Sequence, residues 1–325
     1  MKQSAPLVSV VTPVYNGGKY LADCIESVLR QRYENWDYTI VNNCSTDDTL
    51  EIAEDYARRD NRIRIISNDR FVSAIENHNI AFRQISSDSK YCKLVSADDW
   101  LYPECIEQLV RLAEAEPSVG VVQSYPINIK EVRWSGLPVT CSVFDGHEIG
   151  RLYLLERVYL TAPSANLYRS TLVRSGKSFF PGSRESADVE ACLRCLQHSD
   201  FGVVHQILSF ERIHDGSVTR KSVSDSYLLD RLALLLEYGP VFLSQDEMSQ
   251  RLEDALEYYY GVLATAIVNA RGGRYWKYHK ERLTELGFRF YSSRLGRALL
   301  FKLGDLVLNP KQTLEKGLRR VAHSA

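Results

Sequence analysis

The sequence has no run of about eighteen or more apolar residues, so it predicts no membrane-spanning helix. Its first residues, Met1 to Pro6, carry neither a long apolar segment nor a cleavage site, and they lead directly into a strand pattern. We therefore expect no secretory signal. Cysteine is sparse as well, because its seven residues are an odd number scattered over 325 positions. Without an export signal, we expect reduced thiols in a cytoplasmic protein.

The chain also lacks a strong net charge. Its formal charge is -1, which creates no general attraction for nucleic acid, so we expect no nucleic-acid partner. Cys192 and Cys195 form a Cys-x-x-C pair without a second pair at zinc spacing, which favours helix packing over a zinc site. The sequence shows no internal repeat. Its length allows one large domain or two moderate ones with a substantial core.

The first 122 residues alternate between strand and helix patterns. Short β-branched runs predict strands, and apolar residues at helical spacing predict helices between them. Such alternation is typical of a mostly parallel sheet with helices on both faces, a Rossmann-like α/β architecture. Ligands of such sheets bind beyond the carboxyl ends of the strands. The expected strands are 7–11, 38–41, 63–66, 91–95 and 119–122, and the expected helices are 20–31, 49–59, 72–85 and one that begins near Pro103.

Two turns in this region have specific expectations. The residues from Thr12 to Gly18 are turn formers, so we expect them to end the first strand. Ser45 or Thr46 is expected to cap the helix over 49–59.

The pattern changes after about Ser124. Short strand-like pieces over 131–134 and 203–210 surround expected helices over 146–157 and 186–198. From Ser222 onward the chain is mostly helical, most clearly over 227–238, 245–269 and 276–286. We therefore expect two domains, 1–220 and a helical C-terminal region, 221–325.

The strand over 91–95 runs into two adjacent carboxylates, Asp98 and Asp99. A carboxylate is costly to bury unless it is paired or bound to a metal. Hard cations such as Mg²⁺ and Mn²⁺ prefer oxygen ligands and commonly share them with substrate phosphates. A solvated acidic turn explains the pair equally well, because aspartate is common in turns.

The C-terminal residues 274–325 have a charge bias, with twelve Lys or Arg against four Asp or Glu. Leucine, alanine and phenylalanine residues are interleaved with these charges from Leu295 to Leu308. A basic amphipathic helix binds an anionic membrane surface. The alternative is a helix that packs on the protein and leaves its basic face in water.

Three stretches carry a resemblance to a known family, family 2 of the inverting glycosyltransferases, which have the GT-A fold. They are Val8 to Gly17 (VSVVTPVYNG), Ile40 to Thr49 (IVNNCSTDDT) and Leu94 to Asp99 (LVSADD) followed by Pro103. Each stretch alone is weak, but their order and spacing are specific. The resemblance covers roughly the first 125 residues, continues weakly to about Arg220 and implies the GT-A fold.

The resemblance implies a nucleotide-sugar site. Thr12, Pro13 and Tyr15 occupy the family's nucleotide loop, and Asn43 occupies the position of its base-reading aspartate. Because an amide both donates and accepts, Asn43 either keeps pyrimidine binding through its carbonyl or changes the choice of base.

The same resemblance assigns the acidic pair. It implies that Asp98 holds the ribose and Asp99 a divalent Mn or Mg ion. Ser96 stands where many members have a further aspartate.

Two later segments complete the implied site. Asp188 aligns with the catalytic base, at a helix start where the helix field should lower its pKa, and Glu185 is its nearest competitor. Arg212 and His214 lie in a segment that resembles the loop closing over the diphosphate, and both side chains offer donors to phosphate oxygens.

The function implied is metal-dependent, inverting transfer of a hexose from a nucleoside-diphosphate sugar, UDP-type, to a hydroxyl of a glycan or lipid-linked acceptor. It would serve surface polysaccharide or glycolipid synthesis, in the cytoplasm or at the inner face of the membrane, with the basic C-terminal helices on the membrane surface. A degenerate nucleotide-sugar-binding protein and a sugar nucleotidyltransferase are the alternatives. The segment after the first strand has no Arg or Lys before Lys19, which argues against the nucleotidyltransferase.

Overall fold

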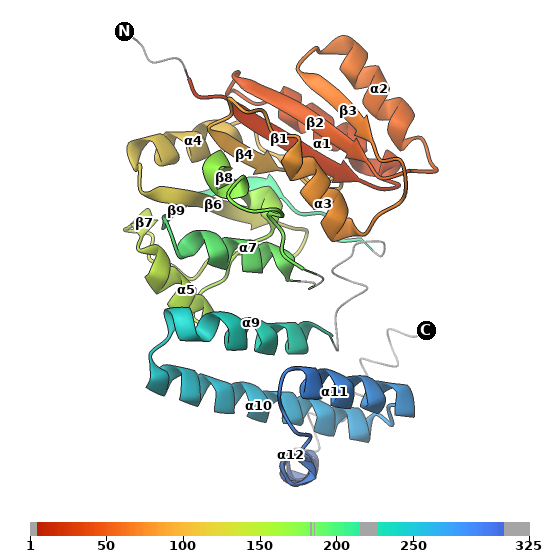
Figure 1. Cartoon of the computed structure of the whole chain (residues 1–325), viewed down its shortest axis with the longest axis vertical. Helices are drawn as coiled ribbons and strands as arrows, with labels where there is room; N and C mark the ends of the chain where they lie inside the picture. The colour runs from red at the N-terminus through yellow and green to blue at the C-terminus, as the bar shows by residue number, and fades with distance from the viewer. Residues whose placement is uncertain (1–4, 183, 185, 215–225, 309–325) are drawn as a thin grey trace. The chain divides into compact units, whose positions relative to one another are not determined.

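The computed structural model describes residues 5–182, 184, 186–214 and 226–308. The chain divides into two compact units, Met1–Val223 and Ser224–Ala325, which are described separately (Figure 1).

The first unit is built on a nine-stranded mixed sheet with the order β3-β2-β1-β4-β8-β6-β9-β5, in which β7 also pairs with β9 (Figure 1). The pairs β1–β2, β2–β3, β1–β4 and β6–β9 are parallel, whereas β8 is antiparallel to both of its neighbours, β4 and β6. The strands are β1 (Val8–Val14), β2 (Trp36–Asn42), β3 (Ile63–Ser67), β4 (Tyr91–Leu94), β5 (Trp100–Leu101), β6 (Val119–Ile127), β7 (Val143–Phe144), β8 (Asn166–Arg169) and β9 (Asp200–Phe210).

Helices fill the connections between these strands. They are α1 (Gly18–Leu29), α2 (Thr49–Arg59), α3 (Ala74–Arg83), α4 (Cys105–Ala115), α5 (Gly146–Leu154), the 3₁₀ turn η1 (Pro163–Ala165), α6 (Ser170–Val173) and α7 (Ala187–Leu196). The expected alternation of strands and helices over the first 122 residues is therefore present.

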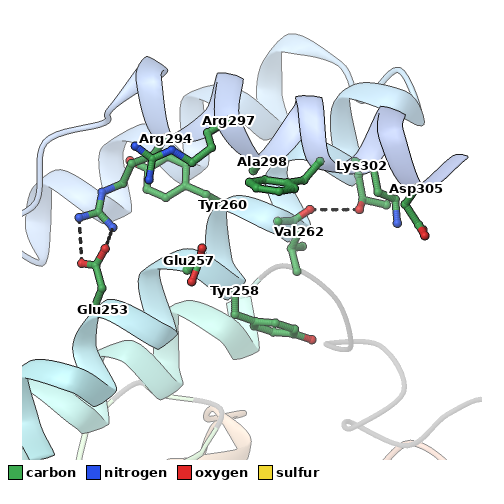
Figure 2. Close-up of a pocket in the computed structure, with 13 residues that line it drawn as sticks. Glu253, Glu257, Tyr258, Tyr260, Val262, Arg294, Arg297, Ala298, Lys302 and Asp305 are labelled. Atoms are coloured by element: carbon green, nitrogen blue, oxygen red, sulfur yellow. Dashed lines mark hydrogen bonds and ion pairs between the residues drawn. The ribbon is translucent and has the colours of Figure 1, made fainter. Parts of the chain in front are cut away.

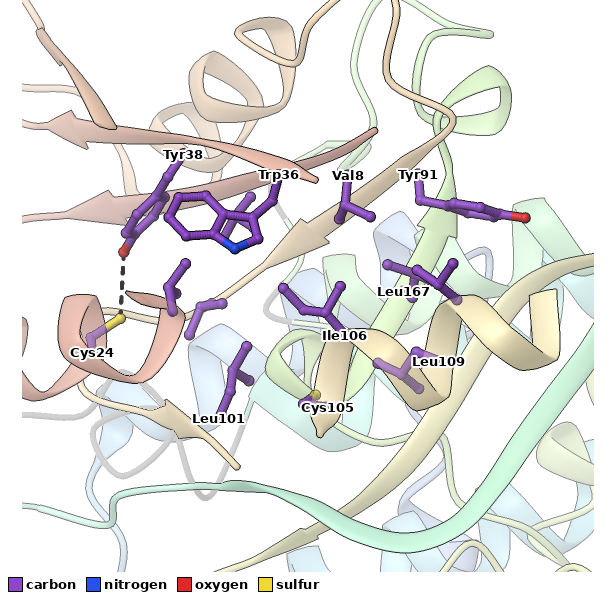
Figure 3. Close-up of a cluster of buried hydrophobic side chains, with 14 of the residues drawn as sticks. Val8, Cys24, Trp36, Tyr38, Tyr91, Leu101, Cys105, Ile106, Leu109 and Leu167 are labelled. Atoms are coloured by element: carbon purple, nitrogen blue, oxygen red, sulfur yellow. Dashed lines mark hydrogen bonds between the residues drawn. The ribbon is translucent and has the colours of Figure 1, made fainter. Parts of the chain in front are cut away.

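Alternating side chains of the central strands point to opposite faces of the sheet. Val8 and Val10 of β1 belong to a buried cluster with Leu21 and Ile25 of α1 and with residues of α4 (Figure 3). Ser9, between the two valines, accepts a hydrogen bond at 3.0 Å from the Ser86 amide, which follows α3. Helices therefore cover both faces.

The second face has an aromatic core. Phe82 of α3 contacts Phe179 at 4.6 Å between ring centroids, and Phe179 contacts Tyr168 of β8 at 5.0 Å. The Tyr168 hydroxyl lies 3.6 Å from Sγ of Cys192 on α7, so α3 and α7 share this face. Cys192 and Cys195 are both buried in helix packing.

Three local predictions are wrong. Thr12 and Pro13 do not end the first strand, because β1 continues to Val14. Proline is tolerated there because β4 pairs with β1 only as far as Val11, so Pro13 has a strand neighbour on one side only. The segment 131–134 forms a single bridge, Ile127 to Val132, rather than a strand.

The predicted cap of α2 is the third error. Asp48 occupies the cap position without a side-chain bond, and Ser45 instead accepts a hydrogen bond from the Asn16 amide.

The second unit is helical, with α9 (Ser226–Phe242), α10 (Gln245–Val268), α11 (Gly273–Glu285) and α12 (Ser292–Leu308). Ser244 and Glu247 form a capping box that begins α10. Leucines and tyrosines of α9, α10 and α11 form its core, against which Leu295 and Ala298 of α12 pack. Among the residues with a described placement, no helix is long and apolar enough to cross a bilayer.

Candidate functional site

Polar residues gather where the parallel strands β1, β2 and β4 end. Tyr15 follows β1, Asn43 follows β2, and Asp98 and Asp99 lie shortly after β4. The carboxyl ends of parallel strands meet at one edge of a sheet, where α/β proteins bind ligands. The structure therefore brings these predicted site residues to one edge.

Asp99 is a buried carboxylate, with only 6% of its surface exposed. Its Oδ2 accepts a hydrogen bond from the Ser164 hydroxyl at 2.6 Å, and its Oδ1 accepts one from the Arg212 amide at 3.0 Å. Burial, with a smaller contribution from the negative charge of Asp98, raises the pKa of Asp99 to about 7, although the hydrogen bonds from Ser164 and Arg212 oppose the rise. The solvated acidic turn is therefore wrong for Asp99, because its carboxylate lies in the protein interior.

Asp98 is more exposed and faces the segment that follows β9. Its Oδ2 lies 3.0 Å from Nε2 of His214, and its backbone carbonyl accepts a hydrogen bond from Nε of Arg212 at 3.1 Å. The structure thus brings Asp98, Arg212 and His214 together. Residues 215–225 lie outside the described part of the chain, so the loop expected after His214 is not traced further.

Arg212 is held from several sides. Its guanidinium lies 4.3 Å from the ring centroid of Tyr20 and 5.0 Å from that of Trp100, and it forms an ion pair with Asp23 at 3.1 Å. Arginine favours such positions over aromatic faces. The positively charged guanidinium of Arg212 therefore lies beside the two aspartates.

The predicted nucleotide-loop residues have different surroundings. Thr12 and Pro13 are buried in β1, and the Thr12 hydroxyl donates to the carbonyl of Val95 at 2.8 Å. Tyr15 is 49% exposed. Only Tyr15 of the three therefore presents its side chain to solvent.

Asn43 is buried, and both ends of its amide are occupied. Its Nδ2 donates to the Val72 carbonyl at 2.9 Å, while its Oδ1 accepts from the Val72 amide and from Nδ2 of Asn68, each at 3.0 Å. The side chain therefore holds the segment between β3 and α3.

Asp188 lies in the first turn of α7 and is partly buried. Its Oδ1 accepts a hydrogen bond from the Val189 amide at 2.8 Å. The expected lowering of its pKa by the helix is wrong in sign. Burial raises the pKa of Asp188 and outweighs the backbone hydrogen bonds that lower it. Its competitor Glu185 lies outside the described residues.

Glu211 is a buried acid that was missed in the sequence. It is 9% exposed and pairs with Arg133 at 3.3 Å. Its pKa is raised by burial, lowered by Arg133, and raised again by the charges of Asp188 and Asp98. Glu211 therefore lies within electrostatic reach of both aspartates. Its position next to Arg212 is the one sequence signal that could have suggested it.

Lys93 and Ser164 were also missed. The Lys93 side chain is fully buried, burial lowers its pKa, and Nζ donates to the carbonyls of Asn166, at 3.1 Å, and Ser164. These two bonds hold η1 in place, and the Ser164 hydroxyl of η1 donates to Asp99. A lysine inside the apolar strand Tyr91–Leu94 is a visible anomaly, whereas nothing in the sequence connects Ser164 with Asp99.

The adjacent Asp98 and Asp99 offer carboxylate oxygens, the ligand type that hard divalent cations prefer, and Asp98 contacts the His214 imidazole at 3.0 Å. No group of three or more His, Cys, Asp or Glu residues able to hold a metal ion occurs among the described residues.

The C-terminal unit has a groove of about 580 Å³ between α10 and α12 (Figure 2). Tyr258 and Phe301 give it apolar walls, and Arg297 and Lys302 lie along it. Arg294 forms a two-pronged ion pair with Glu253 at 2.8 and 2.9 Å. The groove therefore combines exposed apolar surface with charged groups.

Comparison of the chain with solved structures identifies the fold. S. aureus TarS 1–349 in complex with UDP-GlcNAc has a TM-score of 0.61 at 17% identity, over 78% of this chain and 72% of that one. The mannosyltransferase PcManGT from Pyrobaculum calidifontis, in complex with GDP-Man and Mn²⁺, has a TM-score of 0.55 at 13% identity, over 94% of this chain and 88% of that one. The expected GT-A type of α/β fold is confirmed.

Sequence comparison agrees over the first part of the chain. Glycosyltransferase GlyG of Streptococcus pneumoniae serotype 4 is 32% identical over 119 residues, which are 37% of this chain and 39% of that protein. The putative glycosyltransferase EpsH of Bacillus subtilis is 32% identical over 117 residues, which are 36% of this chain and 33% of that protein. The chain thus spans less than half the length of these relatives. The model of glycosyl transferase family 2 matches residues 9–176, just over half of the chain, and the chain belongs to that family.

Proposed function

We propose that the chain is a metal-dependent inverting glycosyltransferase, which moves a sugar from a nucleoside-diphosphate donor to an acceptor hydroxyl. The observation that carries this proposal is the acidic pair at the carboxyl edge of the parallel strands. Asp98 contacts the His214 imidazole at 3.0 Å, and the buried carboxylate of Asp99 accepts hydrogen bonds from the Ser164 hydroxyl and the Arg212 amide. These carboxylates suit a donor site, and the carboxylate of Asp188, in the first turn of α7, suits a base.

Asp188 is the proposed general base. A base is most effective when its pKa lies closer to the working pH, and burial moves the pKa of Asp188 in that direction. Asp188 takes the proton of the acceptor hydroxyl while that oxygen forms a bond to the anomeric carbon. The bond from this carbon to the diphosphate oxygen breaks, and the electron pair leaves with the nucleoside diphosphate. A single displacement inverts the anomeric configuration.

The donor site is proposed at the strand edge. Asp98 would hold the ribose, Asp99 would hold a Mn or Mg ion, and Arg212 and His214 would contact the diphosphate. When bound, the cation would neutralise charge that develops on the leaving diphosphate. The two similar folds were solved with UDP-GlcNAc and with GDP-Man, which supports a nucleotide sugar. We propose a UDP-type hexose donor for this chain.

The acceptor is proposed to be a glycan or a lipid-linked glycan of surface polysaccharide synthesis, reached at the inner face of a membrane. Residues 273–308 contain eight Lys or Arg and three Asp or Glu. On α12, Leu300 and Phe301 are each 72% exposed and Leu308 is 81% exposed. Exposed apolar side chains beside basic ones suit an anionic lipid surface.

The test replaces the base. In Asp188→Asn, transfer should fall by about a hundredfold or more, the usual contribution of a general base, while nucleotide binding persists. Release of nucleoside diphosphate, measured with Mn²⁺ over a panel of donors, gives the rate, and calorimetry gives the binding. Full activity of the variant would refute the role of Asp188.

One observation favours a second candidate, a nucleotide-sugar-binding protein without catalysis. Asn42, Asn43, Ser96 and Ala187 occupy positions at which the resemblance leads us to expect acids. Donor binding without release of nucleoside diphosphate, for any donor and acceptor, would support it. Release of pyrophosphate from a nucleoside triphosphate and a sugar phosphate would instead indicate a nucleotidyltransferase.

A further inference from the structure

The residues that follow β6, 128–135, start at the same edge of the sheet as the acidic pair, and we name them the β6 turn. Strand β8 is antiparallel to both β4 and β6, so β4 and β6 run in the same direction and end at the same edge. Strand β9 is parallel to β6, so Glu211 and Arg212, which follow β9, reach this edge as well. A side chain that the β6 turn presents therefore lies on the sheet edge that carries the proposed donor site.

The backbone is fixed on both sides of Trp134, a residue of the β6 turn. The Arg133 amide donates to the Pro126 carbonyl at 2.9 Å, and the Ser135 carbonyl accepts from the Tyr159 amide, also at 2.9 Å. The Trp134 side chain is nevertheless 54% exposed. A segment that is ordered before a ligand arrives loses less conformational entropy when the ligand binds.

Further exposed apolar side chains accompany Trp134. Tyr159, whose amide pairs with Ser135, is 69% exposed, and Ile129 of the β6 turn is 78% exposed. Charged side chains of both signs are exposed on the same two segments, namely Lys130, Glu131 and Arg157. Exposed apolar groups with a polar rim mark an interaction site. This combination suits a pyranose, because the C–H face of the sugar packs on an aromatic ring while its hydroxyls both donate and accept hydrogen bonds.

The β6 turn is tied to the segment that contacts the acidic pair. Nε of Arg133 lies 3.3 Å from Oε2 of Glu211, and Glu211 directly precedes Arg212, whose amide donates to Asp99. The other oxygen of Glu211, Oε1, is buried and has no hydrogen-bond partner within the described part of the chain. Buried acceptors in folded proteins normally have a partner. Oε1 therefore lacks a donor that a sugar hydroxyl would supply.

We propose that Trp134 and Tyr159 stack on a pyranose ring of the acceptor, with a hydroxyl of that ring on Oε1 of Glu211. The inference rests on the proposed function and names the acceptor as a glycan that is recognised through its sugar. The donor site is proposed at the ends of β1, β2 and β4, whereas this surface follows β6. Donor and acceptor thus approach along one sheet edge from different strands.

The experiment measures binding of maltotetraose, cellotetraose and chitotetraose to the full chain, with UDP and Mn²⁺ present, by calorimetry. At least one oligosaccharide should bind the wild type. Trp134→Ala should weaken it by about tenfold, the scale expected when the apolar contact of one ring face is lost, and Trp134→Phe should retain most of the affinity. Tyr227→Ala changes an exposed aromatic of the second unit, on α9, and as the control should bind as the wild type does.

Donor binding separates this inference from the proposed function. Trp134→Ala should bind UDP with Mn²⁺ as the wild type does, because Trp134 lies outside the proposed donor site. A wild type that binds UDP but none of the oligosaccharides, or a Trp134→Ala variant with wild-type affinity for them, would overturn the inference. Sedimentation velocity tests a second copy of the chain on this surface, and a dimer that Trp134→Ala dissociates would overturn it too. A wild type that binds no nucleotide would instead refute the proposed function.

Discussion

Asp99 should reduce the stability of the fold that carries it. Its carboxylate is buried, and its pKa is raised from the ordinary value of 3.8 to about 7, first by burial and then by the charge of Asp98. Above pH 7 the folded protein holds this group charged at a cost. A tenfold change in proton affinity is worth about 1.4 kcal/mol, so the cost is about 4 kcal/mol.

The sign of the pH dependence follows from the direction of this change. Between about pH 4 and pH 7 the unfolded chain has released the proton of Asp99 and the folded chain still holds it, so stability falls as the pH rises. Asp99→Asn removes this dependence. The structure accommodates the amide, because Oδ1 still accepts from the Arg212 amide and Nδ2 can donate to the Ser164 hydroxyl. The Ser164 proton then turns to Oγ of Ser96, which lies 3.2 Å away.

The assay is thermal unfolding of the full chain in a chelator at pH 4.5 and pH 8. Asp99→Asn should melt on the order of 10 °C above the wild type at pH 8, and much closer to it at pH 4.5. Asp88→Asn, at an exposed position, is the control and should change the free energy of unfolding by less than about 0.5 kcal/mol. An Asp99→Asn variant that is less stable at pH 8, or equally stabilised at both pH values, would refute the reasoning.

Three further predictions concern the base, the C-terminal helices and two glycines. The transfer rate should rise with pH as Asp188 loses its proton. The rise should occur at a higher pH than for an ordinary aspartate, because burial raises the pKa of Asp188, and a rate–pH profile checks this. The full chain should sediment with anionic vesicles, less so at high salt, and Phe301→Glu should weaken this at least tenfold; equal binding to zwitterionic vesicles would contradict the charge argument. Gly146→Ala should cost about 2 kcal/mol or more by denaturant titration, because its Cβ would lie 1.9 Å from the Ser199 carbonyl oxygen. In contrast, Gly261→Ala meets open space inside α10 and should stabilise its unit by about 1 kcal/mol.

The sequence predicted those features that depend on local pattern. The strands near Val8, Tyr38 and Tyr91 and the helix over 49–59 follow from runs and spacings of apolar residues, and the edge that gathers Tyr15, Asn43 and Asp98 follows from parallel pairing. What Asn43 and Asp99 contact could not be predicted. Val72 and Ser164, their partners, are 29 and 65 residues away along the chain, and side-chain packing alone brings them together.

The pKa of Asp188 illustrates a different limit. The helix field is visible in the sequence because it depends on position in the first turn, whereas burial depends on the residues that cover the carboxyl group. Burial was the larger effect, so the local argument gave the wrong sign. The same holds for Glu211, whose pKa is raised by burial and by the charges of Asp98 and Asp188, which belong to distant segments of the chain.

The position of β8 has a consequence for the order of folding. The residues that carry the family resemblance most clearly end near 125, yet β8, residues 166–169, lies between β4 and β6 in the sheet. A chain that stops after β6 would lack the strand that joins its two halves. The contacts of β4 with β8 are long-range, which is typical of slow, late steps in folding. During synthesis, the acidic edge should therefore form only after β8 has left the ribosome, and short N-terminal fragments should not bind donor independently.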